Sequence, residues 1–254
     1  TGVQTCALPI YIHTHKKELE GVIGHVSQDD LLIEELTVFQ NLFFNAKLCF
    51  GDNSESEIRE KVIKTLTDLG LYETRDLKVG SPLEKTISGG QRKRLNIALE
   101  LIREPSVLFV DEPTSGLSSR DSENIMDLLK ELSLKGKLIF VVIHQPSSDI
   151  YKMFDKMLIL DVGGYPIFYG NPVDAVIYFK RLIHHVKCEE SECELCGNVN
   201  PEQIFNIIET KVLDEYGNHT QNRKYSPSEW SDYYREQIES RLESDRKSTR
   251  LNSS

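Results

Sequence analysis

Long apolar runs are missing from this sequence of 254 residues. No stretch approaches the roughly 18 consecutive apolar residues of a membrane-spanning helix. The longest runs, 138–143 and 157–160, have the length of buried strands. The first residues also lack the basic start and long apolar stretch of a signal peptide. We therefore expect any link to a membrane to be made by a partner or by further chain.

Positive charge is also in short supply. The chain has 30 Lys and Arg against 40 Asp and Glu, a formal net charge of −10. Sequence-independent binding to nucleic acid depends on basic side chains that neutralise phosphates, so this balance predicts no nucleic-acid partner. The hydrophobic content of 39% is ordinary for a globular protein and allows a sizeable core.

Cysteine is scarce and scattered. The five cysteines are Cys6, Cys49, Cys188, Cys193 and Cys196. Their odd number and spread argue against a secreted disulfide framework and favour the cytosol. The last three offer thiolates that a zinc ion or an iron–sulfur cluster can use. Their spacing matches no standard finger, so buried packing of small side chains is the competing interpretation.

The two ends of the chain differ from the middle. Residues 1–10 and 246–254 have no periodicity and no continuity with their neighbours, and we expect both to be non-native. Between them we expect a main domain over 11–185, with a helical subdomain over about 30–103. A C-terminal extension is expected over 186–245, after a boundary near residue 185.

Helix signals punctuate the main domain. Ser54 and Glu57 form a capping-box pattern, followed by apolar residues on one helical face and by Gly70 as a stop. Residues 91–103 and 121–132 repeat the helical period. The predicted apolar faces consist of Ile58, Val62, Leu66 and Leu69, then Leu95, Ala98, Leu99 and Ile102, then Ile125, Leu128, Leu129 and Leu132.

Short apolar runs alternate with these helices. Residues 107–110 and 137–143 are expected to be buried strands, because a central parallel strand is apolar on both faces. Residues 156–161 and 166–169 flank a Gly-Gly pair, which is typical of a hairpin at a sheet edge. The alternation of strand and helix predicts an α/β fold with a parallel sheet.

The C-terminal extension is polar, with a helix expected over 201–216. Aromatic residues follow around Trp230. Trp230, Tyr233 and Tyr234 are equally consistent with a hydrophobic docking face and with local packing.

The strand at 107–110 is followed by two acids, Asp111 and Glu112, in VLFVDEPTS. The carboxyl edge of a parallel sheet is where α/β proteins bind ligands. There Asp111 would hold Mg²⁺, which prefers hard oxygen ligands. Glu112 would orient or deprotonate the water that attacks a γ-phosphate. The competing interpretation is a strand end with two solvated acids.

Three further features gain meaning from their order along the chain. SGGQ at 88–91 opens a helix, where backbone N–H groups and the helix dipole favour a phosphate. His144 ends the second strand and can donate a hydrogen bond to a phosphate, and Gln28, in GHVSQDD, can coordinate a metal or a water. Each feature alone has an ordinary structural interpretation, but their combined order is not a chance arrangement.

Together these motifs resemble the ATP-binding cassette (ABC) family. GHVSQDD is similar to the Q-loop, ISGGQRKR to the signature, VLFVDEPTSGL to the Walker B segment with its D-loop, and VVIHQPS to the switch-histidine loop. The resemblance runs from about Tyr11 to Phe179 and is strongest to G-subfamily transporters and bacterial ABC-2-type exporters. It implies a P-loop NTPase (RecA-like) parallel sheet, incomplete at the N-terminus, with a helical subdomain. GNVNPEQIFNIIE resembles the Asn-Pro segment that leads toward the membrane domain in the G subfamily.

The resemblance also implies a role for each matched residue. Gln28 would sense the γ-phosphate and Mg²⁺ and contact the transmembrane partner, and Asp111 would bind the metal. Glu112 would be the catalytic base and His144 the γ-phosphate clamp. The residues expected near the ATP of the opposite subunit are Ser88, Gly89, Gly90, Gln91 and Ser118. Two cassettes would then work as a head-to-tail pair at the cytoplasmic face of a membrane, where ATP binding and hydrolysis drive transport.

Two departures from the family pattern change these expectations. No G-x-x-x-x-G-K-[ST] phosphate loop (Walker A) occurs in the chain. The family places it upstream of Tyr11, so we expect this chain by itself to bind ATP weakly and not to turn it over. Ser118 stands where the D-loop usually has Asp, and a hydroxyl brings no charge across the interface between cassettes. Asp121 either compensates or caps the next helix.

Two other functions stay open. A soluble ABC ATPase acting on ribosomes or DNA typically has two cassettes or a long coiled coil, and neither pattern occurs here. A non-catalytic regulatory cassette is favoured by the missing phosphate loop, whereas Glu112 and His144 argue against it.

Overall fold

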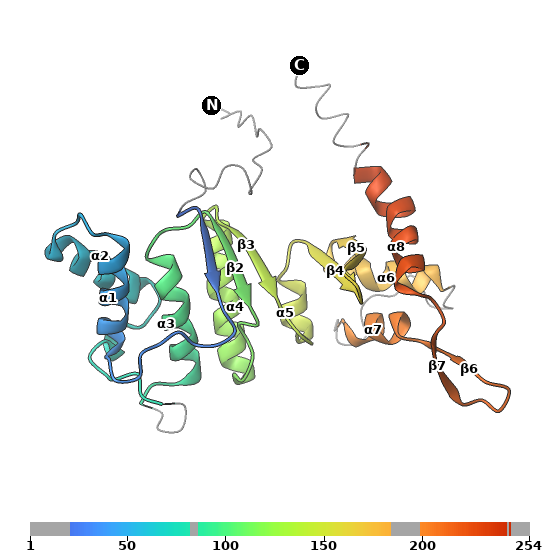
Figure 1. Ribbon diagram of the computed structural model, residues 1–254, viewed down its shortest axis with the longest axis horizontal. Coiled ribbons are helices and arrows are strands. Elements are labelled where there is room, and N and C mark those ends of the chain that lie inside the picture. The colour runs from blue at the N-terminus through green and yellow to red at the C-terminus, as the bar shows by residue number, and fades with distance from the viewer. Residues whose placement is uncertain (1–20, 82–85, 184–198, 243, 245–254) are drawn as a thin grey trace, which may run out of the picture. The chain divides into compact units, whose positions relative to one another are not determined.

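The computed structural model describes residues 21–81, 86–183, 199–242 and 244 (Figure 1). The chain divides into two compact units, one ending at His144 and the other beginning at Gln145. The boundary expected near residue 185 and the two end segments lie outside the described residues, so those expectations stay predictions. No helix in the described part is long and apolar enough to cross a membrane.

A three-stranded parallel sheet lies at the centre of the first unit, and it confirms the predicted α/β fold. Its strands, in order across the sheet, are β1 (Ile23–Val26), β2 (Val107–Asp111) and β3 (Leu138–Val142). Both pairs of neighbours are parallel, and Asp111 lies opposite Val142 in the register. The three strands therefore end at the same edge of the sheet, and this edge positions the residues that follow them.

Three helices pack beside the sheet around an apolar core of their own. They are α1 (Val38–Cys49), α2 (Glu55–Asp68) and α3 (Gly89–Leu101), with a 3₁₀ turn at Tyr72–Thr74. The predicted capping box opens α2, because the Ser54 N–H donates to the Glu57 carboxylate at 2.8 Å and the Ser54 hydroxyl accepts from the Glu57 N–H. The four predicted apolar residues of α2 are all buried. The capping residues and the apolar periodicity therefore predicted α2 correctly.

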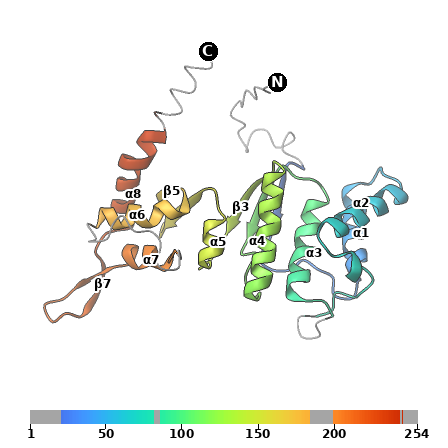
Figure 2. The same cartoon turned by 180° about the vertical axis from the view of Figure 1, so that it is seen from behind.

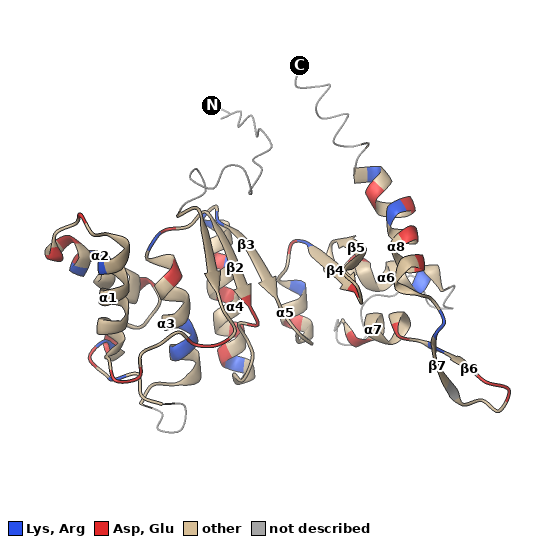
Figure 3. Ribbon diagram, viewed as in Figure 1, with Lys and Arg blue, Asp and Glu red and all other residues tan. Residues whose placement is uncertain are grey.

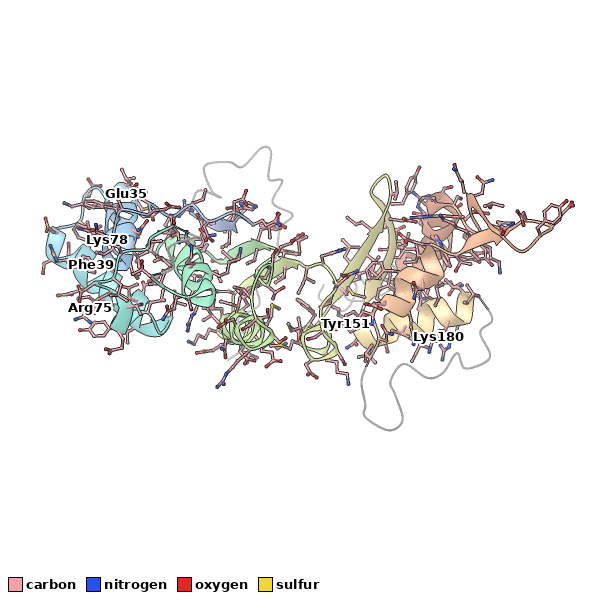
Figure 4. The ribbon with its side chains drawn as sticks, turned by 90° about the horizontal axis from the view of Figure 1, so that it is seen from below. Glu35, Phe39, Arg75, Lys78, Tyr151 and Lys180 are labelled. Carbon is pink, nitrogen blue, oxygen red and sulfur yellow. The ribbon has the colours of Figure 1, made fainter. Side chains whose placement is uncertain are left out.

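The segment before α3 is tied to the start of α1 by backbone hydrogen bonds. The Phe39 N–H donates to the Arg75 carbonyl at 2.9 Å, and Thr37 forms an antiparallel bridge with Lys78. Figure 4 shows the labelled Glu35, Phe39, Arg75 and Lys78 close together at this end of the first unit. These bonds hold residues 75–78 against the start of α1.

The helix α4 (Ser119–Leu134) covers one face of the sheet together with α3 (Figure 2). Of its four predicted inward residues, Ile125 and Leu129 are buried, and Leu128 and Leu132 are partly buried. The predicted helix is thus confirmed, and it extends two residues further at each end.

The opposite face of the sheet is open among the described residues. The rings of Phe109 and Phe140 stack on this face with centroids 4.8 Å apart, and the two side chains are 40% and 47% exposed. Leu138 and Val142 are exposed as well. The prediction of a strand over 137–143 is confirmed, but its predicted burial is wrong, because the described helices cover only one of its faces.

The second unit contains two hairpins and four helices in its described part. Its elements are α5 (Ser148–Lys152), β4 (Met157–Asp161), β5 (Tyr165–Gly170), α6 (Pro172–Leu182), α7 (Glu202–Ile208), β6 (Lys211–Leu213), β7 (His219–Arg223) and α8 (Pro227–Tyr234), followed by a π-helical turn at Arg235–Glu239. The predicted first hairpin is confirmed, since β4 and β5 pair antiparallel. Its turn uses Gly163 and Gly164 at φ of 86° and 77°, which glycine adopts readily. It forms a two-stranded sheet of its own.

The helix predicted over 201–216 is wrong in its second half. Only α7 is helical, and the chain then forms the β6–β7 hairpin. The carboxylate of Asp214 accepts hydrogen bonds from the Tyr216 and Asn218 N–H groups, and Gly217 has a φ of 81°. This Asp–Gly turn competes with helix propagation and reverses the chain.

The aromatic residues of the tail form part of the core of the second unit. Trp230 on α8 is 1% exposed, and its ring contacts Phe179 and Tyr225 at centroid distances of 5.5 and 4.9 Å. Of the two interpretations that the sequence allowed for Trp230, local packing is therefore the one observed.

Candidate functional site

The predicted site residues follow the three parallel strands at one edge of the sheet. Gln28 lies two residues after β1, Glu112 directly follows β2, and His144 lies two residues after β3. The Gln28 Nε2 donates a hydrogen bond to the Glu112 Oε2 at 3.0 Å, across 84 residues of sequence. The structure thus brings together the amide and the acid that sequence analysis selected, and it places the exposed imidazole at the same edge.

Glu112 has an unusual backbone conformation. Its N–H donates to the Val142 carbonyl at 2.9 Å, which extends the pairing of β2 with β3 by one residue. Its φ is 41°, in the left-handed region that side chains rarely adopt. Gln145, the neighbour of His144, has a φ of 47°. Strained positions of this kind cluster at functional sites. Here one of them is the predicted base Glu112 and the other is next to His144 in sequence.

Asp111 and Gln28 are the residues that can hold a metal ion. Asp111 is half-buried at the end of β2, and the Gln28 amide uses its nitrogen toward Glu112, which leaves the amide oxygen as a ligand. A carboxylate and an amide oxygen suit Mg²⁺, which takes few protein ligands and keeps waters and substrate phosphates. The described residues contain no cluster of three His, Cys, Asp or Glu side chains. The donor set therefore fits Mg²⁺ brought with a phosphate better than a permanent structural metal.

The SGGQ segment forms the start of α3. The Ser88 hydroxyl accepts from the Gln91 N–H at 3.2 Å, and the Gln91 side chain accepts from the Ser88 N–H at 2.8 Å. A Cβ on Gly89 would lie 3.2 Å from Leu117, and one on Gly90 would lie 2.7 Å from the Asp121 carboxylate. A side chain at Gly90 would thus have to displace the Asp121 carboxylate, and one at Gly89 would meet the tip of the Leu117 side chain. The helix dipole at this end favours an anion.

Ser118, and not Asp121, caps the helix that follows the D-loop segment. Ser118 is the N-cap of α4, since its hydroxyl accepts from the Asp121 N–H at 3.1 Å and lies 2.8 Å from the Asp121 carboxylate. The suggestion that Asp121 caps this helix is therefore wrong. A serine caps a helix at least as well as an aspartate, so the departure from the family pattern at this position has a local structural function.

Three buried polar residues of α3 were missed by sequence analysis. Arg92, Lys93 and Asn96 are 8%, 5% and 3% exposed, and all three contact residues 27–31, which we call the Gln28 loop. Burial lowers the pKa of Lys93, against the opposing effect of nearby carboxylates, Asp30 first. Figure 3 shows basic residues of α3 beside the acidic chain that follows β1. Their positions on the helix could have indicated this burial, because i, i+1 and i+4 lie on one face that borders the buried apolar residues.

A cavity of about 490 Å³ joins several of these motifs in the first unit. Gln28, Gly89, Lys93 and the segment Ser115–Leu117 line it together. The Q-loop, signature and D-loop segments are therefore neighbours in space as well as in order. The three cysteines at 188, 193 and 196 lie outside the described residues, so their metal binding stays a prediction.

Comparison with known proteins agrees with these motifs. The family model described as ABC transporter matches residues 7–115. The chain is 43% identical over 160 residues to ABC transporter G family member 14 of Arabidopsis thaliana, covering 63% of this chain and 24% of that protein. The same figures hold for the broad substrate specificity ATP-binding cassette transporter ABCG2 of Bos taurus. ABC transporter G family member 24 of Dictyostelium discoideum is 42% identical over 168 residues, or 64% of this chain and 14% of that protein.

The chain spans about a quarter or less of the length of these relatives. The region 7–115 contains Gln28, the SGGQ segment, Asp111 and Glu112, whereas His144 lies beyond it. The family match, the G-family relatives and the contact between Gln28 and Glu112 agree on one assignment. The match over residues 7–115 and the G-family relatives support an ATP-binding cassette ATPase domain of the G subfamily in this chain.

Proposed function

We propose that this chain is the nucleotide-binding domain of a membrane transporter, which couples the binding and hydrolysis of ATP to movement of a substrate across a membrane. The observation that carries the proposal is the 3.0 Å hydrogen bond between the Gln28 amide and the Glu112 carboxylate at the shared edge of the sheet. This contact supports the assignment of Gln28 as a water-orienting amide and of Glu112 as a general base, because parallel sheets bind ligands at this edge. The G-family relatives are named as transporters.

Each residue at the edge has a chemical role in this proposal. Asp111 and the Gln28 amide oxygen hold Mg²⁺, and the bound Mg²⁺ supplies charge neutralisation for the phosphates. Glu112 accepts a proton from the attacking water. His144 donates a hydrogen bond to the γ-phosphate.

The proposed working unit is a head-to-tail pair of such domains on the cytoplasmic face of a membrane. Ser88, Gly89, Gly90 and Gln91 form the start of α3, and in this proposal the helix dipole at that end attracts the phosphates of the ATP held by the partner domain. Ser118 lies at the same interface in this proposal.

The helical part after Gln28 is proposed to contact the transmembrane partner. In support, this part exposes apolar side chains: Leu31, Ile33, Phe44 and Leu48 are between 47% and 88% exposed. Exposed apolar residues in one region are typical of a protein interface. The soluble alternative acting on ribosomes or DNA gains no support, because the relatives are transporters by name.

The proposal is tested by the turnover of Mg-ATP. Because the chain contains no G-x-x-x-x-G-K-[ST] loop, the full-length gene product is the protein to assay. Replacing the carboxylate by its amide, Glu112→Gln, removes the general base, and turnover is expected to fall by about 100-fold or more. ATP binding, measured by fluorescent-analogue titration, is expected to persist.

The matched control is Glu123→Gln, at an exposed acid on α4. This control removes the same charge from the second turn of α4, where Glu123 has no part in the predicted site, and it is expected to leave turnover unchanged. Equal turnover in Glu112→Gln and in the unmodified protein would refute the proposed role of the acid.

A further inference from the structure

Five hydrogen bonds connect α3 with the Gln28 loop, and one of them is also an ion pair. The Lys93 Nζ donates to the carbonyls of Ser27 and Gln28 at 3.3 and 3.0 Å. The Asn96 side chain donates to the Ser27 carbonyl at 3.4 Å and accepts from the Leu31 N–H at 3.3 Å. The Arg92 Nε donates to the Asp30 carboxylate at 3.1 Å, and this contact is also an ion pair. The loop is thus held to one helix along its whole length.

Lys93 makes the most direct of these contacts. Its ammonium group binds the carbonyl of Gln28 itself, whose side chain donates to Glu112. A buried ammonium group is costly unless it is paired, and here it has two carbonyl acceptors and lies near the carboxylates of Asp30 and Asp111. An uncharged residue would fill the same space without that cost. The charge at this position is therefore better explained by the loop that it holds than by core packing.

The other end of the connection is the start of the same helix. Ser88 caps α3, and Lys93 lies little more than one turn further along. Gly89 and Lys93 both line the 490 Å³ cavity that borders Gln28. A helix transmits displacement as a rigid body, so a movement of its N-terminus also displaces Lys93 and the backbone of Gln28. The cavity leaves space for such a movement.

We propose that Lys93 is a positioning residue that holds Gln28 against α3, the helix that begins with the signature segment. Nucleotide contact at Ser88–Gly90 then adjusts the Gln28–Glu112 contact within the same chain. This inference rests on the proposed function, because it assigns the two ends of the link to two different ATP molecules. One ATP is held by the partner domain at the start of α3, and the other is held by this chain at the sheet edge. Lys93 then couples the two sites through a single helix.

The positional part of the proposal is tested without nucleotide. In the 254-residue chain, hydrogen exchange of the Leu31 amide reports the loop, since this N–H donates to Asn96. Lys93→Met keeps the length of the side chain and removes its donors, and exchange at residues 27–31 is expected to accelerate about tenfold or more, as for loss of a hydrogen bond from a charged group. Lys64→Met, at an exposed position of α2, is the matched control and is expected to leave exchange unchanged.

Exchange at residues 107–111 of β2 shows whether the sheet stays folded in the variant. Asn96→Ala removes the acceptor of the Leu31 N–H and a donor to Ser27, so it shows the size of exchange change that the loss of loop contacts produces. Unchanged protection of residues 27–31 in Lys93→Met would overturn the proposal.

The coupling is tested by ATP turnover in the full-length gene product, with Gln28→Ala, Lys93→Met and their combination. If Lys93 acts through Gln28, the double variant loses no more activity than Gln28→Ala alone, and the Hill coefficient for ATP falls toward one in Lys93→Met. Multiplicative losses, or an unchanged Hill coefficient, would contradict the coupling.

The two tests separate the two claims. Absence of any ATP turnover in the unmodified full-length protein would refute the proposed function and, with it, the coupling. The exchange experiment would still decide whether Lys93 positions the Gln28 loop.

Discussion

The helices α2 and α3 begin in the same way and differ in what they bury. Each has a serine N-cap in a capping box, Ser54 with Glu57 and Ser88 with Gln91, and their lengths are 14 and 13 residues. The buried face of α2 consists of apolar side chains alone. α3 buries apolar side chains and, in addition, Arg92, Lys93 and Asn96.

This difference separates the formation of a helix from its use. Capping and apolar periodicity explain why both segments are helical. They do not explain why α3 takes a lysine and an arginine out of water, since burying charge costs free energy unless partners compensate. The partners of Lys93 and Asn96 lie on the Gln28 loop, whereas Arg92 pairs with Asp30 of that loop and also donates to the Val79 and Gly80 carbonyls. Lys93 and Asn96 therefore connect the polar face of α3 to the site at the sheet edge. We therefore expect changes in α2 to affect stability, and matched changes in α3 to affect both stability and ATP turnover.

The largest expected effect concerns a glycine that α2 does not need. In Gly90→Ala the new Cβ would lie 2.7 Å from the Asp121 carboxylate, which Ser118 already holds by a hydrogen bond. We expect overpacking to lower the free energy of unfolding by about 1–3 kcal/mol, measured by urea denaturation. Gly51→Ala is the control, because no atom lies within 4 Å of its added Cβ.

The control variant is expected to change stability by no more than about 0.5 kcal/mol. Adding Asp121→Ala to Gly90→Ala should recover part of the loss. An unaltered unfolding midpoint in Gly90→Ala would show that the start of α3 packs less closely than in this structure.

A smaller effect is expected from the two N-caps. Ser54→Ala and Ser88→Ala should each lower the free energy of unfolding by about 0.5–2 kcal/mol, because each removes one hydroxyl acceptor. In the full-length protein, only Ser88→Ala is expected to reduce ATP turnover. Equal turnover in both variants would remove the functional distinction between the two helices.

The smallest expected effect is a pH dependence that α2 has and α3 lacks. Hydrogen bonds from the Ser54 N–H and hydroxyl lower the pKa of Glu57 below 4.5. A carboxyl whose pKa is lower in the folded state stabilises the fold above the unfolded pKa, and this contribution disappears as the pH falls through the folded pKa. The corresponding residue of α3 is Gln91, which does not titrate.

Glu57→Gln should therefore lose less stability than the unmodified chain between about pH 6 and about pH 3, measured by thermal unfolding at each pH. Gln keeps the side-chain acceptor of the capping box, so the helix start is preserved. The same loss in both proteins would assign the acid sensitivity to other carboxylates.

The sequence predicted those features that depend on neighbouring residues. The capping box at Ser54 and the turn at Gly163 are local, and both were found as predicted. The meeting of Gln28 and Glu112 was also predictable, because parallel strands end at one edge of a sheet and the order of the motifs identified the strands.

Two of the errors concern contacts between distant segments, and the third, the helix that ends at Ile208, concerns a local turn. The exposure of Phe140 depends on which helices cover the sheet, and the loss of helix after Ile208 depends on a hairpin that Asp214 and Gly217 start. The burial of Lys93 depends on a loop 65 residues away in sequence. Periodicity within one segment carries no information on such partners.

The most direct test of the account is a structure of the full-length protein with Glu112→Gln, Mg²⁺ and ATP. We expect the Asp111 carboxylate and the Gln28 amide oxygen to lie next to the Mg²⁺. The His144 imidazole is expected within about 3 Å of a γ-phosphate oxygen. ATP bound away from the ends of β1, β2 and β3, or a His144 side chain remote from the γ-phosphate, would contradict the claim that these residues form one ATP site.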